Sequence, residues 1–237
     1  MAEAEQSRNN QNARQAMLDS IRRHLSASAR FDAVHAEHLA CVAAAAPAIA
    51  TPAIPAARDS LLDRFRKELS GLAGRCIVVP DEPAAAAAVQ EIVAENGAGR
   101  IAISDSPLVR RVIGLKDFAC EFLERPKAVE LFDCDIGITS AQWLLCETAT
   151  LVLDAAVEQH RLASLVPPVH IAICESNRLR ASVGEVLEAL SQRAPADLSR
   201  TITFVTGPSR TSDIELKLAI GVHGPGRLYV IIIESQA

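Results

Sequence analysis

The sequence has few aromatic residues: Phe, Trp and Tyr make up 3% of its 237 residues, and there is a single tryptophan. Its hydrophobic content is nevertheless 49%, so a core has to be assembled from Ala, Val, Ile and Leu. That content supports a sizeable core, and the length fits one large domain or two small ones.

The chain also lacks an excess of positive charge. It carries 24 Lys and Arg against 29 Asp and Glu, a formal net charge of −5. Proteins that bind nucleic acid present a basic surface to the phosphates, and no run rich in Lys and Arg and interleaved with aromatics occurs here. We therefore predict that nucleic acid is not a partner.

Close cysteine pairs are missing. The six cysteines are Cys41, Cys76, Cys120, Cys134, Cys146 and Cys174. Zinc sites and iron–sulfur clusters usually draw on C-x-x-C pairs, so we predict no metal site and no cofactor in this chain. Scattered thiols in a chain without a signal peptide indicate reduced cysteines and a cytoplasmic location.

Neither an export signal nor a membrane span is predicted. Residues 1–10 lack a basic segment followed by an apolar one. The longest apolar stretch, residues 39–50, is interrupted by Pro47. It falls short of the ~20 residues that a transmembrane helix needs.

Familiar catalytic motifs are absent as well. The chain has no G-x-S-x-G elbow, no G-x-x-x-x-G-K-[ST] loop and no H-E-x-x-H pair. The glycine-rich segment at residues 221–226, GVHGPG, is not a dinucleotide fingerprint, because it neither follows a strand nor opens a helix. A nicotinamide cofactor is therefore not predicted.

Residues 1–58 are predicted to form a helical arm and a linker, followed by the main domain at residues 59–237. Apolar residues recur at four-residue spacing: Ala13, Met17, Ile21 and Leu25. This spacing predicts an amphipathic helix over residues 11–28, which packs on the main domain or contacts a partner. Residues 43–58 combine alanine with three prolines, which excludes a continuous helix there.

From Cys76 onward, short apolar runs alternate with helical patterns. Strands are predicted at residues 76–79, 101–103, 128–132, 136–139, 151–153, 169–173, 201–205 and 228–233. Helices are predicted over residues 60–72, 83–96, 141–146, 177–192 and 213–220, with a short one after Pro107. Apolar strands that alternate with helices imply a largely parallel sheet covered on both faces. The predicted fold class is α/β, with three layers, α/β/α.

The most informative stretch is residues 206–226, TGPSRTSDIELKLAIGVHGPG. Ser212 and Glu215 form a capping box for the predicted helix, which leaves the segment GPSRT outside it. Amides at a helix N-terminus and the guanidinium of Arg210 suit a carboxylate or phosphate. Simple capping by Asp213, with Arg210 paired to it, is the open alternative. His223 lies between glycines, and we expect it to be exposed.

These residues resemble the C-terminal signature of the LUD-domain proteins, specifically the lactate utilization protein C (LutC/YkgG) family. Residues 137–153 (GITSAQWLLCETATLVL), Arg161 and residues 167–171 (PPVHI) agree with the same family. The resemblance covers most of residues 60–235 and implies a NagB/RpiA/CoA-transferase-like fold. The family pattern has Glu-Thr-Gly-Thr where this chain has Ala149, which would hinder a ligand that needs close backbone approach or a positive φ.

In such folds ligands gather beyond the carboxyl ends of the strands, and we expect residues 139–140, 147–150 and 206–211 to meet there. Glu147 is the candidate catalytic residue. The candidate ligand-binding residues are Thr148, Thr150, Arg161, His170, Gly207, Ser209, Arg210, Thr211, Asp213, His223 and Gly224.

Structural roles remain open for three of these residues. For Glu147 the alternative is a hydrogen bond from backbone at a helix end, and for Arg161 it is an ion pair with Glu158 or Asp154 on the surface. His170 precedes an apolar strand, where a hydrogen-bonded histidine without a catalytic role is equally compatible with the sequence.

The resemblance implies a subunit without a cluster in a system that oxidises L-lactate to pyruvate. Iron–sulfur clusters would then reside in partner oxidoreductase subunits, and this chain would bind a small carboxylate or phosphate-like anion. Two alternatives belong to other classes. One is an autonomous acyl- or CoA-transferase with Glu147 as nucleophile, and the other is a structural scaffold.

Overall fold

The computed structural model describes residues 58–194, 197, 199–211 and 219–234, together with residues 15, 17–20 and 23 near the N-terminus. The chain divides into two units, Met1–Ala53 and Ile54–Ala237. In the first unit the described residues are helical, and the Gln15 amide donates to the Asp19 carboxylate one turn on, at 3.1 Å. The rest of the predicted helix 11–28 and the linker up to residue 57 lie outside the described residues.

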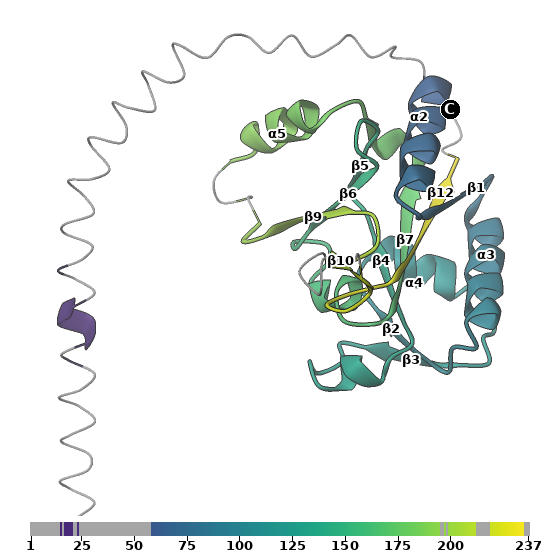
Figure 1. Ribbon diagram of the computed structural model, residues 1–237, viewed down its shortest axis with the longest axis horizontal. Helices are drawn as coiled ribbons and strands as arrows, with labels where there is room; N and C mark the ends of the chain where they lie inside the picture. The colour runs from purple at the N-terminus through teal and green to yellow at the C-terminus, as the bar shows by residue number, and fades with distance from the viewer. Residues whose placement is uncertain are drawn as a thin grey trace, which may run out of the picture. The chain divides into compact units, whose positions relative to one another are not determined.

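Six parallel strands form the central sheet of the second unit (Figure 1). In spatial order they are β1 (Arg75–Val79), β12 (Arg227–Ile233), β7 (Val169–Glu175), β4 (Ile136–Ser140), β2 (Arg100–Ile103) and β3 (Glu121–Glu124). The sequence missed β3, which lies at one edge. The predicted parallel sheet is confirmed.

Two helices pack on one face of this sheet. They are α3 (Glu82–Glu95) and α4 (Pro107–Ile113), whose apolar residues share a buried cluster with Ile171 and Ile173 of β7. Helix α3 begins as its sequence indicates, because the Asp81 carboxylate accepts the Ala84 amide at 2.8 Å.

The opposite face of the sheet is covered by α2 (Arg58–Gly71). Phe65 and Leu69 of this helix are fully buried in one cluster with Ala172 and Cys174 of β7. Consecutive residues of β7 therefore belong to opposite clusters, which is why this strand is apolar throughout rather than alternating. The three-layer arrangement is confirmed.

A four-stranded sheet shares the layer of α2. Its strands, in spatial order, are β8 (Leu179–Arg180), β5 (Trp143–Leu145), β6 (Thr150–Asp154) and β9 (Ile202–Thr206). Leu144 and Leu151 belong to the same buried cluster as α2. The loop after β9 contains part of the 206–226 motif, so this second sheet determines where that motif lies.

The helix predicted at residues 141–146 is wrong, because Trp143–Leu145 is a strand antiparallel to β6. Leu144 packs toward α2, whereas Trp143 and Leu145 pack in a separate cluster with α5 (Val183–Ser191). A strand buried on both faces gives a continuous apolar run, and such a run does not distinguish strand from helix.

Two further predictions need correction. The strand expected at residues 128–132 is a 3-10 helix, η1 (Glu130–Asp133). The helix expected over residues 177–192 is shorter, because η3 (Ser176–Arg178) and β8 precede α5. Other predicted strands correspond to β1, β2, β4, β6, β7, β9 and β12.

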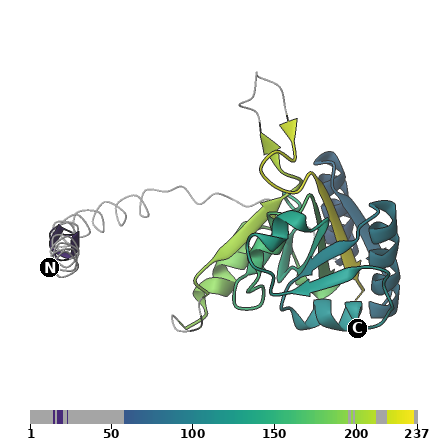
Figure 2. The same cartoon turned by 90° about the horizontal axis from the view of Figure 1, so that it is seen from below.

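The helix predicted over residues 213–220 is also wrong at its end. Ala219–Ile220 forms strand β11, which pairs with β10 (Arg210–Thr211) in an antiparallel hairpin. Figure 2 shows β10 and β11 standing out from the body of the second unit. Residues 212–218 lie outside the described residues.

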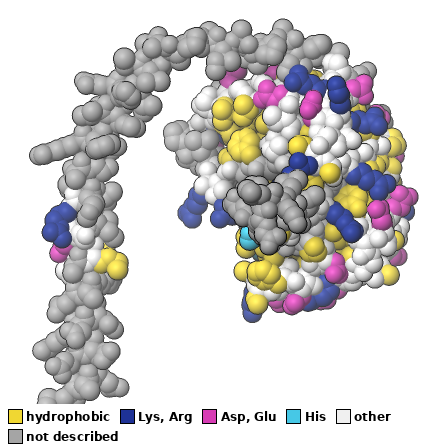
Figure 3. Space-filling view, viewed as in Figure 1, with side chains coloured by type: hydrophobic (Ala, Val, Ile, Leu, Met, Phe, Trp, Pro, Cys, Tyr) yellow, Lys and Arg dark blue, Asp and Glu magenta, His cyan; other side chains and the backbone are white. Residues whose placement is uncertain are grey.

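The surface carries both signs of charge. On the face shown in Figure 3, Lys and Arg side chains alternate with Asp and Glu. Within the described part of the chain, no helix is both long enough and apolar enough to cross a bilayer.

Candidate functional site

A cavity of about 430 Å³ lies where the loop after β9 meets the beginnings of β7 and β12. We refer to it as the first cavity. The predicted ligand-binding residues that line it are His170, Gly207, Ser209, Arg210, His223 and Gly224. The two glycine-containing loops of the 206–226 motif thus meet at one site.

The position of the first cavity corrects the sequence-based expectation. His170 and Leu228 are the second residues of β7 and β12, so the cavity lies at the amino ends of these strands rather than at their carboxyl ends. The reason is the second sheet. The loop at residues 207–209 follows β9, which belongs to that sheet, and not a strand of the parallel sheet.

Backbone hydrogen bonds hold the two loops together. The Ser209 amide donates to the Pro225 carbonyl at 2.8 Å, and the Gly221 amide donates to the Ser209 carbonyl at 3.0 Å. The free helix N-terminal amide that the sequence predicts at Ser209 is therefore engaged. The Ser209 amide is therefore not a free donor for an anion in this cavity.

Gly207 and Arg210 attach the first loop to the end of α2. Gly207 has φ +74°, and a Cβ there would lie 3.1 Å from the Leu72 Cβ, so this turn favours glycine on both counts. One Nη atom of Arg210 donates to the Leu72 carbonyl at 2.6 Å. This bond uses one of the five N–H donors of the guanidinium.

His170 is the buried wall of the first cavity. Its side chain is 1% exposed, and Nε2 lies 2.8 Å from the Thr139 hydroxyl. Nδ1 has no hydrogen-bond partner among the described residues. Burial lowers the pKa of His170 from 6.5 to about 4, so the ring is neutral at physiological pH.

The charge in the walls of the first cavity has one sign. Arg210 is positively charged, and both Arg210 and His223 are exposed side chains. None of the described residues that line the cavity is an aspartate or a glutamate. The described walls therefore contain no carboxylate to offset the charge of Arg210.

A chain of hydroxyls connects the Glu-Thr-Ala-Thr segment to this cavity. Thr148 and Thr150 hydroxyls lie 2.7 Å apart, and Thr150 and Thr206 hydroxyls also lie 2.7 Å apart. Thr206 lines the cavity. Ala149, between the first two, has φ +49°, a backbone conformation that glycine adopts without strain.

The other predicted site residues lie elsewhere. The Glu147 carboxylate accepts the Val183 amide at 2.8 Å at the start of α5, and Glu147 is not part of the first cavity. Arg161 is exposed on the 3-10 helix η2 (Arg161–Ser164), whose Ser164 does line the cavity. Only the backbone of Thr211 is described, in β10, and Asp213 lies outside the described residues.

Sequence reasoning missed two buried acids. Asp154 and Glu158, expected on the surface, are 2% and 0% exposed. Arg193 pairs with Asp154 at 2.6 Å, and the Ser199 hydroxyl also donates to Asp154. Burial raises the pKa of Asp154, but hydrogen bonds from Ser199, Ala156 and Arg193 outweigh it and leave that pKa below its usual value. The four-residue spacing of the two acids after a strand was the available signal.

Comparison with known proteins identifies the family. The model of the LUD domain matches residues 62–233. The chain belongs to the LUD-domain family. This LUD domain includes both loops of the first cavity and nearly all of the second structural unit.

Several curated relatives share a name. The chain is 38% identical over 104 residues to "Lactate utilization protein C" of Halalkalibacterium halodurans, covering 43% of this chain and 45% of that protein. It is 26% identical over 190 residues to the protein of the same name in Bacillus subtilis, covering 79% and 75%. The first of these alignments spans less than half of the relative.

The fold also matches a solved structure. A DUF162 family protein from Deinococcus radiodurans aligns with a TM-score of 0.60 at 23% identity, over 76% of this chain and 99% of that one. This likeness supports the fold of the LUD domain described above.

Proposed function

We propose that this LUD protein is a subunit without a cluster in a system that oxidises L-lactate to pyruvate, and that its first cavity binds a small carboxylate. The shared name of its relatives supports the pathway, and the charge of the cavity walls supports the ligand. The observation that carries the proposal is the convergence of Arg210, His223 and His170 on one cavity whose described walls contain no carboxylate.

Each group has a distinct role toward such a ligand. Arg210 retains donors beyond the one given to Leu72, and a carboxylate accepts two parallel N–H bonds from a guanidinium. His223 adds a second donor at the mouth. His170, neutral at physiological pH, forms the buried wall of the cavity beside the ligand. A volume of about 430 Å³ is within the range of small-molecule sites.

The thiols support placing the clusters in partner subunits. The five described cysteines are free, and burial raises the pKa of Cys76 to about 11 and that of Cys146 to about 12. Metal ligation requires the thiolate, which such burial disfavours. We accordingly propose iron–sulfur oxidoreductase subunits as partners and the reducing cytoplasm as the location.

Calorimetry tests the ligand. L-lactate, pyruvate and inorganic phosphate are titrated into the wild type, Arg210→Gln and Arg227→Gln. Arg227 is an exposed arginine that contacts Asn96 and does not line the cavity, which makes it the matched control. We expect saturable binding of a carboxylate that weakens about tenfold or more in Arg210→Gln and is unchanged in Arg227→Gln. Equal binding in all three proteins, or none, contradicts the proposal.

Affinity purification tests the partners. The tagged full-length chain, expressed in its native host during growth on L-lactate, is expected to co-purify with proteins whose visible absorption shows iron–sulfur clusters. Recovery of this chain alone would contradict the proposed assembly and would leave the ligand proposal to the calorimetry.

A further inference from the structure

A second cavity, of about 470 Å³, lies at the carboxyl ends of the parallel strands, whereas the first cavity lies at their amino ends. Its walls include Ser106 in the loop after β2, Ser140 at the end of β4 and Glu175 at the end of β7. Ligands of parallel α/β sheets bind at this edge, beyond the carboxyl ends of the strands. Of the segments that the sequence placed at the carboxyl ends of the strands, residues 139–140, 147–150 and 206–211, only Ser140 is among the described residues that line the second cavity.

A buried carboxyl group lies directly behind Ser140. Glu158 is 0% exposed, and its Oε1 accepts three hydrogen bonds: from the Ser140 amide at 3.1 Å, from the Ser140 hydroxyl, and from the Gln142 side-chain amide at 3.3 Å. Oε2 has no hydrogen-bond partner among the described residues. A carboxyl group in this environment is costly to bury, and burial raises its pKa.

These bonds fix the direction of the Ser140 hydroxyl. Its Oγ accepts an N–H from Gln142 at 3.0 Å, so its own proton points to Glu158 Oε1. Hydrogen bonds from Ser104, Ser140 and Gln142 oppose the effect of burial on the pKa of Glu158. The remaining lone pair of Ser140 Oγ therefore accepts from a ligand that brings a donor.

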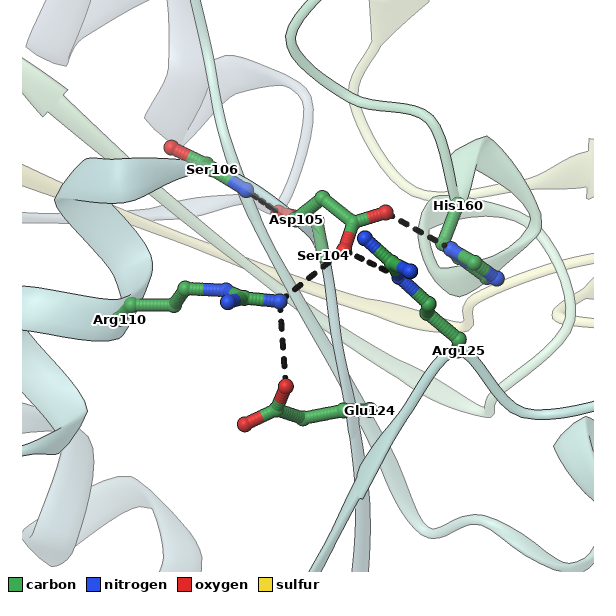
Figure 4. Close-up of polar contacts among 7 residues, drawn as sticks. All are labelled: Ser104, Asp105, Ser106, Arg110, Glu124, Arg125 and His160. Atoms are coloured by element: carbon green, nitrogen blue, oxygen red, sulfur yellow. Dashed lines mark hydrogen bonds and ion pairs between the residues drawn. The ribbon is translucent and has the colours of Figure 1, made fainter.

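Asp105 connects the loop after β2 with the segment that contains Glu158. Its side chain is 10% exposed and accepts Arg110 at 3.1 Å and Arg125 at 3.0 Å, and it lies 3.2 Å from His160 Nδ1 (Figure 4). Asp105 adjoins Ser106 of the cavity wall, and His160 follows Glu158 by two residues. The contacts of Asp105 therefore hold the loop that contains Ser106 against the segment that contains Glu158.

Three arginines line the second cavity, and two of them are firmly paired. Arg111 bonds to Glu82 at 2.7 Å and Arg193 to Asp154 at 2.6 Å. Arg178 lies 3.9 Å from Glu175, a much weaker contact, and its side chain is 50% exposed. Arg178 is the cation in the described walls that is most available to an anion.

We propose that the second cavity is a ligand site for a small hydroxy acid, whose hydroxyl donates to Ser140 Oγ and whose carboxylate binds Arg178. Glu158 acts through Ser140 and is a positioning residue that fixes the serine proton. A keto acid lacks the donor that Ser140 requires, so this site discriminates hydroxy acids from keto acids.

The proposal is tested by NMR on the full-length chain labelled with ¹⁵N. The Gln142 side-chain amide contacts Ser140 and reports on this cavity alone, so its resonance is followed during titration with glycolate and with pyruvate. Glycolate is expected to shift the resonance saturably in the wild type and equally in Arg210→Gln, which lies in the first cavity. This control keeps the outcome separate from that of the proposed function.

Substitutions in the second cavity supply the decisive comparison. Ser140→Ala and Arg178→Gln are expected to weaken glycolate about tenfold or more, and pyruvate to bind about tenfold more weakly than glycolate. Glu158→Gln retains the Oε1 acceptor and should bind as the wild type does, whereas Glu158→Ala should not. Absence of a saturable shift, binding of glycolate by Ser140→Ala and Arg178→Gln as tightly as by the wild type, or loss of binding in a folded Glu158→Gln would overturn the proposal.

Discussion

The hydroxyls of Thr150 and Thr206 lie 2.7 Å apart and join β6 to β9 beside the first cavity. Through this bond the Glu-Thr-Ala-Thr segment supports the glycine loop without lining the cavity itself. Two stretches separated by more than fifty residues in the sequence thereby act as one structural element.

Replacing Thr150 by valine should therefore weaken both the fold and the site. The side chain is 4% exposed, and its loss leaves the Thr148 and Thr206 hydroxyls without their shared partner. We expect the free energy of unfolding to fall by about 1–2 kcal/mol. Chemical denaturation measures the change, with Thr203→Val on the neighbouring strand β9 as the control. An equal loss in both variants would show that the hydroxyl chain has no special role.

The buried histidine predicts a specific acid sensitivity. The unfolded imidazole binds a proton near pH 6.5, whereas the folded ring resists protonation until about pH 4. Between these values the unfolded state holds more protons, so stability decreases as the pH falls, by about 3 kcal/mol in total. Denaturation of the wild type and His170→Gln from pH 7.5 to 4 isolates this contribution. Parallel stability curves would show that His170 titrates normally in the folded protein.

Two alanines with positive φ give different expectations for replacement by glycine. Ala73 has φ +63° and is exposed, so Ala73→Gly should relieve strain and raise the free energy of unfolding by about 1 kcal/mol. Ala149 has φ +49° but is fully buried, and Ala149→Gly also removes a buried methyl worth about 0.8 kcal/mol. We therefore expect Ala149→Gly to leave the free energy of unfolding nearly unchanged. A large destabilisation by Ala149→Gly would mean that the methyl packing dominates.

Glu147 is expected to act as a helix cap. Ser182, the residue before α5, makes no capping bond with its side chain, and Glu147 accepts the Val183 amide instead. Glu147→Ala should lower the free energy of unfolding by about 1 kcal/mol, and Glu147→Gln, which keeps the acceptor, by less. Hydroxylamine trapping after exposure to an acyl-CoA provides the chemical check. A covalent adduct on Glu147 would contradict the capping role and favour the transferase alternative.

Much of the parallel sheet was readable from the sequence. Its strands are short apolar runs separated by helices with clear boundaries, such as the Asp81 cap and Pro83 at the start of α3. The run at residues 143–145 was misassigned, because burial on both sides by non-local partners leaves no periodic pattern. Likewise, nothing local in Ala219–Ile220 reveals its pairing with β10.

The site was only partly predictable for the same reason. Motif residues such as Arg210 and His223 were identified, and they do share a cavity. Which edge of the sheet they occupy depends on the second sheet, whose β9 delivers the loop to the amino ends of β7 and β12. The burial of Glu158 depends on Ser140 and Gln142, which contact it across at least sixteen residues of chain.

A crystal structure of the full-length chain with L-lactate tests the central claim most directly. The account predicts lactate in the first cavity, with its carboxylate within hydrogen-bond distance of the Arg210 guanidinium and its hydroxyl on the side of His170. Ordered lactate that contacts neither residue, in crystals where the first cavity is open to solvent, would contradict it.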